Sequence, residues 1–163
     1  MGSITDSAIT PGTNAVANEM TLTAGLTYNL FQVTGVVRVN FIYGIVTTAL
    51  PAAVTAARLE LFPAGGAPIP ITLAAGTDIS AAPTGSVVSK TNLAGVALTY
   101  SNSTLGLFED AAGLVFTTCV IGQQTGGIDT YIRFARAGAG ASGVIYWRAE
   151  WVPLSIGAGL VAV

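Results

Sequence analysis

Apolar and polar residues alternate with a period of two along several stretches of this chain, and that spacing is typical of β-strands. Residues 35–47 are the first clear example, because alternate side chains there separate into two sets on opposite faces. The first set is Val37, Val39, Phe41, Tyr43 and Ile45, and the second is Val36, Arg38, Asn40 and Ile42. No segment carries a sustained apolar stripe with the 3.6-residue period of a helix. The chain is therefore expected to be all-β.

Further strands follow from the same pattern. Residues 144–152 place Ile145, Trp147, Ala149 and Trp151 on one face and Tyr146, Arg148 and Glu150 on the other. Residues 53–62 place Ala57, Leu59 and Leu61 inward and Arg58 and Glu60 outward. Residues 113–122 form an apolar, β-branched run, which predicts a strand buried on both faces.

Short strands separated by Gly- and Pro-rich turns predict an antiparallel β-sandwich or a small barrel. The turns are expected at residues 63–70, 123–127 and 137–143. Residues 1–20 are polar, small and without a period, so an irregular N-terminal arm is expected there. One domain is then expected over residues 21–163, and a chain of this length can bury a core without disulfide bonds.

The residue types exclude most catalytic and metal-binding arrangements. The chain has no histidine, so neither a Ser-His-Asp triad nor a histidine metal site is possible. Its one cysteine, Cys119, is expected to be a small buried apolar residue. Glu109 and Asp110 are adjacent, and neighbouring residues of a strand point to opposite faces, which separates the two carboxylates. We therefore expect no enzyme activity, no metal and no cofactor.

Charge and hydropathy also limit the partners. The formal charge is −2, and the arginines are scattered, so no basic patch exists that would bind nucleic acid. Residues 39–57 are free of charge, but Pro51 and many β-branched residues predict two strands and a turn rather than a membrane helix. The first twenty residues contain no Lys or Arg, unlike a secretory signal. No membrane association is expected.

Five aromatic residues lie close together near the C-terminus and allow two interpretations. They are Tyr131, Phe134, Tyr146, Trp147 and Trp151. An exposed aromatic face can stack on sugar rings, which would indicate a carbohydrate-binding surface. Trp147 and Trp151 share a face with Ile145 and Ala149, however, and this composition favours the core. Tyr146 lies on the outer face, where another subunit could cover it.

Sparse charge indicates that other protein covers part of the surface. Charged residues are 9 % of the chain, against about a quarter in ordinary soluble domains. The segment after Pro153 contains only Leu, Ile, Val, Ala and Gly apart from Ser155, so its apolar surface is expected to be buried against protein. It can add a strand to its own sheet or dock on a neighbour. The expected interface residues are Tyr146, Arg148, Glu150, Leu154, Leu160, Val161 and Val163.

The C-terminal stretch ASGVIYWRAEWVPLSIGAGLVAV resembles the end of small virion structural proteins of tailed bacteriophages. In those proteins a glycine-led strand with alternating aromatic and charged residues runs into a PLS-G turn and a short apolar end. Here the turn contains Pro153, Leu154, Ser155 and Gly157, and the resemblance covers 23 of the 163 residues. It implies a head decoration (cement) protein with a jelly-roll or other small β fold. It also implies a homo-oligomer, a trimer above all, bound to the capsid lattice protein on the virion surface.

Two functions of different classes follow. The first is a non-enzymatic capsid decoration protein that stabilises the head lattice as a homo-oligomer. The second is a carbohydrate- or receptor-binding β-sandwich module of a tail fibre or adhesin. Exposure of Trp147 or Trp151, or a pocket formed by loops, would favour the second.

Overall fold

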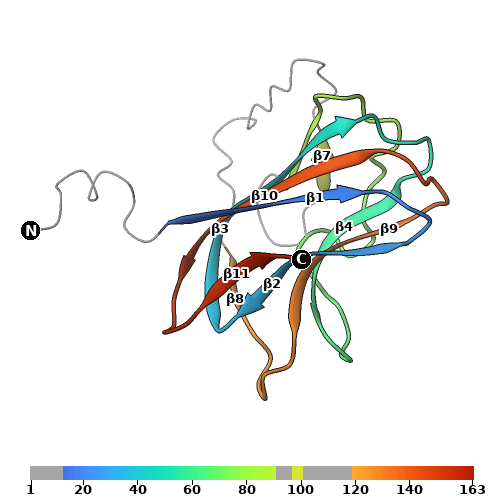
Figure 1. The fold of residues 1–163 in the computed structure, drawn as a ribbon. Helices are drawn as coiled ribbons and strands as arrows, with labels where there is room; N and C mark the ends of the chain where they lie inside the picture. The colour runs from blue at the N-terminus through green and yellow to red at the C-terminus, as the bar shows by residue number, and fades with distance from the viewer. Residues whose placement is uncertain (1–12, 91–96, 101–118) are drawn as a thin grey trace, which may run out of the picture.

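The computed structural model describes residues 13–90, 97–100 and 119–163, and in that part of the chain the protein is an all-β sandwich (Figure 1). The expected fold class is confirmed. Two antiparallel sheets pack face to face. Sheet A contains β1 (Asn14–Thr21), β3 (Val36–Thr48), β6 (Val87–Lys90), β7 (Leu98–Tyr100), β8 (Cys119–Gly122) and β10 (Val144–Pro153). Sheet B contains β2 (Thr27–Thr34), β4 (Thr55–Pro63), β5 (Ile69–Pro70), β9 (Thr130–Ala137) and β11 (Gly159–Ala162).

The strand order is that of a jelly roll. Sheet A runs β1-β10-β3-β6-β7, with β8 paired to the other half of β3, and sheet B runs β11-β2-β9-β4-β5. Without β6, β7 and β11, the two sheets are β1-β10-β3-β8 and β2-β9-β4-β5. Consecutive strands therefore alternate between the sheets except at the β4–β5 hairpin, which is the connectivity of two Greek keys wound into eight strands.

Two expected boundaries differ from the structure. The irregular arm was expected to reach residue 20, but β1 begins at Asn14 and pairs with β10 along its whole length, so residues 14–20 belong to the sandwich. Residues 1–12 lie outside the described residues. Of the strand expected at 113–122, only β8 is described, and its Val120 is 64 % exposed. The expectation of burial on both faces is therefore wrong for that part.

A β-bulge at Asn40 reverses the faces of β3. Glu150 on β10 pairs with Phe41 and the next residue, Trp151, pairs with Val39, which leaves Asn40 as the extra residue. Val37 and Val39 before the bulge are buried, whereas after it the buried positions are Ile42, Gly44 and Val46. The sequence alternation in residues 35–47 was thus misleading after Val39, because a single inserted residue exchanges inside and outside.

The core lies between the sheets and is centred on aromatic contacts. Trp147 on β10 is fully buried, and its ring centroid is 5.7 Å from that of Phe134 on β9 in the opposite sheet. Trp151 is 9 % exposed. Gly44 faces Trp147 across the ladder, and a Cβ there would lie 3.1 Å from the indole ring. The expected core position of the two tryptophans is confirmed.

A buried arginine joins three links at one end of the sandwich. Arg136, on β9, is 4 % exposed. Its guanidinium donates to five backbone carbonyls and to a hydroxyl. The acceptors are Ala53, Gly138, Thr23, Gly25 and Gly140, with the Tyr28 hydroxyl at 3.4 Å. These carbonyls belong to the loops that connect β1 to β2, β3 to β4 and β9 to β10, so one guanidinium fixes all three loops.

Trp147→Ala is expected to lower the free energy of unfolding by about 3–5 kcal/mol, because it removes a large buried side chain and leaves a cavity between the sheets. Chemical denaturation followed by far-UV circular dichroism measures the change. Val161→Ala, at a position 51 % exposed, is the control and should change stability by no more than about 0.5 kcal/mol. A Trp147→Ala protein as stable as this control would contradict the described core.

Arg136→Met is expected to destabilise the fold by about 3 kcal/mol, because hydrogen bonds to a charged group contribute about 1.5–3 kcal/mol each and water replaces only some of them. Arg136→Lys should lose less, since lysine keeps the charge but has fewer donors. Arg38→Met is the matched control, because Arg38 donates a hydrogen bond to the Asn40 side chain and should be replaceable at a cost of no more than about 1 kcal/mol. Equal thermal stability of the two Met variants would show that the hydrogen bonds of Arg136 do not stabilise the fold.

Candidate functional site

The outer face of sheet A carries three of the residues expected at an interface. Tyr146, Arg148 and Glu150 alternate with buried residues along β10, and Tyr146 is 38 % exposed. Because β10 lies between β1 and β3, these side chains project from the middle of the sheet rather than from its rim. In the described part of the chain, neither Arg148 nor Glu150 forms an ion pair.

The C-terminal segment adds a strand to its own sheet. β11 pairs antiparallel with β2, and Leu160 is 3 % exposed within the core. Of the two expected alternatives, addition of a strand to its own sheet and docking on a neighbour, the structure shows the first. The expected interface role of Leu160 is wrong in the folded protomer. Leu154, Val161 and Val163 remain about half exposed.

The turn between β10 and β11 displays an apolar side chain to solvent. Ile156 is fully exposed (106 %) in a turn closed by a hydrogen bond from the Ala158 N–H to the Ser155 carbonyl. The turn is tied to the start of β3, because the Val36 N–H donates to the Ser155 hydroxyl and the Leu154 N–H donates to the Val36 carbonyl. Ile156 is therefore held on a fixed support.

Further apolar residues surround this turn on the outer face of sheet A. Val36 pairs with Gly122 of β8 on one side and binds Leu154 on the other. Val120 lies on the same face, opposite Arg38, which is two residues further along β3 than Val36. We call Val36, Val120, Leu154 and Ile156 the turn patch. Sequence reasoning identified only Leu154, although an isoleucine placed between Ser155 and Gly157 in a turn is an available signal.

A buried carboxylate lies on sheet B where an exposed one was expected. Glu60 is 1 % exposed and forms ion pairs with Arg58, at 3.0 Å, and with Arg133 on the neighbouring strand. The Arg133 guanidinium also lies 3.8 Å from the centroid of the Phe62 ring. The outward position of Glu60 in the alternation is correct, but the two arginines and their neighbours cover it.

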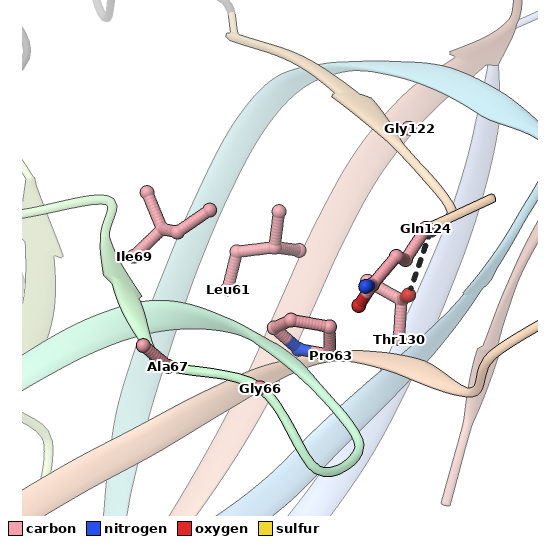
Figure 2. Close-up of a pocket in the computed structure, with 8 residues that line it drawn as sticks. All are labelled: Leu61, Pro63, Gly66, Ala67, Ile69, Gly122, Gln124 and Thr130. Carbon is pink, nitrogen blue, oxygen red and sulfur yellow. Dashed lines mark hydrogen bonds between the residues drawn. The ribbon is translucent and has the colours of Figure 1, made fainter.

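An apolar groove opens between the edges of the two sheets. Its larger part, about 360 Å³, lies between the β4–β5 hairpin and the residues from the end of β8 to the start of β9, and Figure 2 shows its lining. The lining residues are Leu61, Pro63, Gly66, Ala67, Ile69, Gly122, Gln124 and Thr130. A smaller part shares Leu61 and Ile69 and continues along β8 past Ile121. We call the whole the β5–β8 groove.

Few polar groups line this groove. The Thr130 hydroxyl already accepts a hydrogen bond from the Gln124 backbone N–H, drawn as a dashed line in Figure 2, and donates to the Ile128 carbonyl. The Gln124 side chain points into the pocket in the same view. Such a lining fits an apolar side chain better than a sugar, because a sugar requires many hydrogen-bond partners.

The acidic residues do not converge on a catalytic site in the described part of the chain. Asp78 accepts a hydrogen bond from the Ser80 backbone N–H, and bonds with Ser80 hold the pKa of this carboxyl below its ordinary value. Asp129 accepts a hydrogen bond from the Gln32 side chain. Glu109 and Asp110 lie outside the described residues. Within them, no group of acidic or cysteine side chains is placed to hold a metal ion.

Neither a membrane-spanning helix, in the part of the chain that the structure describes, nor a known relative was found. Among the described residues, no helix has the length and apolar character needed to span a bilayer. No family model, no curated protein and no solved structure matches the chain.

Glu60→Gln is expected to lower the free energy of unfolding by about 2–3 kcal/mol. Removing one member of a buried ion pair costs about 3–5 kcal/mol, and the effect should be smaller here because Arg58 is 28 % exposed. Glu150→Gln, which removes an unpaired acid on the other sheet, is the control. If denaturation midpoints of the two variants are the same, the Glu60 cluster contributes no net stability.

Proposed function

We propose that this chain is a non-enzymatic structural subunit of a virion, a head decoration protein that binds the capsid lattice as a homo-oligomer. The observation that carries the proposal is the turn patch, in which a tied turn presents the fully exposed Ile156 beside Val36 and Leu154. Apolar groups on a fixed support bind a partner without first losing conformational entropy.

The distribution of charge supports the same proposal. Arg136 is buried, and Arg58 and Arg133 are engaged by Glu60, so three of the five arginines contribute little to the solvated surface. On the outer face of sheet A, Phe41 and Tyr43 pack against one another with ring centroids 5.2 Å apart, and they lie opposite Glu150 and Arg148 of β10. Aromatic residues and a few arginines on a surface with little other charge are typical of protein interfaces.

The proposed mechanism is mechanical. Copies that bind only the assembled lattice stabilise it by mass action, because their binding free energy is lost when the lattice comes apart. A β-sandwich with a packed aromatic core suits this role, since interiors of this density deform little under load. Residues 141–163 resemble small virion proteins of tailed bacteriophages, so the proposed partner is the capsid lattice of such a phage.

The alternative, a receptor-binding module, is supported by one observation, the β5–β8 groove. Burial of Trp147 and Trp151 removes the stacking surface on which a carbohydrate-binding function was based. The groove favours an apolar protein segment as the ligand. We favour the decoration function, because the turn patch presents exposed apolar side chains on a turn that is hydrogen-bonded to β3.

Ile156→Asp is expected to weaken binding to the capsid by about tenfold or more, because it places a charge in the contact. Heads of the virus that encodes the chain, prepared without this protein, are mixed with the purified protein and sedimented through sucrose. Leu26→Asp is the control, since Leu26 is another exposed apolar residue, at 51 %, but lies in the β1–β2 loop. Failure of the unaltered protein to sediment with heads would refute the decoration function.

A further inference from the structure

β1 is the longest edge strand among the described residues, and it lacks the features by which natural proteins protect an edge. Its eight residues pair with β10 without a register shift and contain neither proline nor lysine. The other edges are better protected, because β5 ends at Pro70 and β8 and β11 have four residues each. Figure 1 shows β1 running along β10 at the border of sheet A.

The backbone groups on the open side of β1 follow from the antiparallel ladder. The Leu22 N–H donates to the Gly143 carbonyl, and the same register makes the even-numbered residues of β1 bond to β10. The N–H and carbonyl groups of the odd-numbered residues therefore point away from the sheet. These residues are Ala15, Ala17, Glu19 and Thr21, and none has a backbone partner on that side in the described part of the chain.

We propose that β1 pairs antiparallel with β1 of a second copy across a two-fold axis, so that sheet A continues from one subunit into the other. This inference rests on the proposed function insofar as it names the contact that forms the homo-oligomer. All four outward residues of each copy find partners when Ala17 lies opposite Glu19 of the partner subunit and Ala15 lies opposite Thr21 of the partner subunit.

Charge selects this register. Ala17 lies across from Arg148 within the subunit, so Glu19 of the partner subunit would stand in the same cross-strand row as Arg148. The methyl group of Ala17 leaves room for the long arginine side chain to reach over it. Shifting the pairing so that Ala17 faces itself would place Glu19 of the partner subunit in the row of Glu150, an unfavourable pair of like charges.

The contact also gives a role to charges that have none within the protomer. Glu19 and Arg148 form no ion pair in the described part of the chain, although both project from the outer face of sheet A. Asn18 donates to the Val163 carbonyl at 2.7 Å, which holds the end of the chain next to the edge of β1. The half-exposed Val163 therefore lies beside the proposed contact.

Ala17→Pro tests the pairing with little effect on the protomer, because the N–H that it removes points away from β10 and proline is tolerated at such edge positions. Light scattering coupled to size exclusion measures the mass over a range of protein concentrations. The unaltered protein is expected to be a dimer and Ala17→Pro a monomer. Val120→Pro, which changes the edge of β8 instead, is the control and should remain a dimer.

Charge reversal tests the register. Arg148→Glu and Glu19→Arg should each weaken the dimer by about tenfold or more, and the double variant should recover most of the loss. An unaltered protein that is monomeric or trimeric, or an Ala17→Pro protein with unchanged mass, would overturn the β1 contact. Binding to heads, measured separately, would still support the decoration function in that case, so the two proposals fail independently.

Discussion

The hydrogen bonds of the Arg136 guanidinium hold one whole end of the sandwich. The β1–β2, β3–β4 and β9–β10 links meet there, and their carbonyls converge on one buried cation. Small residues make the approach possible, since a Cβ at Gly140 would lie 2.4 Å from the Pro51 ring. Burial alone would raise the pKa of the Tyr28 phenol, but hydrogen bonds with Arg136 and Thr23 lower it below its ordinary value. Because β1 ends and β10 begins at this cluster, the guanidinium also sets where their ladder stops.

The sandwich uses part of its sparse charge internally. Among the described residues Arg136 forms no ion pair and instead joins three loops, whereas Glu60 is enclosed by Arg58 and Arg133 on sheet B. Sheet A has the opposite arrangement, with Arg148 and Glu19 exposed and unpaired in the described residues. The chain therefore fixes its own structure with three of its five arginines, whereas Glu19, Arg148 and Glu150 stand on the face that we assign to assembly.

Sequence patterns correctly predicted which side chains face the core in regular strands. They missed features that depend on contacts between residues distant in sequence. Alternation in β10 correctly placed Trp147 in the core and Tyr146 outside, because that strand is regular in the middle of a sheet. The same reasoning failed in β3, since the bulge at Asn40 arises from pairing with β10 and leaves no mark in the composition. Burial of Glu60 likewise depends on Arg133, which is 73 residues away in sequence. Of the turn patch only Leu154 was identified, because the patch combines residues of β3, β8 and the β10–β11 turn.

The jelly-roll order leaves the two sides of the sandwich different, and this determines what each can bind. At one side the Asn18 side chain on β1 donates to the carbonyls of Leu30 and Val163, which joins the edges of the two sheets. At the other side β5 and β8 stand apart, and the apolar groove opens between them. Among the described strands, only β1 offers a full ladder of backbone groups to a new strand. The groove offers almost no hydrogen-bond partners, so only side chains can occupy it. Self-pairing through the backbone and docking through side chains thus belong to opposite sides of the molecule, and one subunit can engage in both at once.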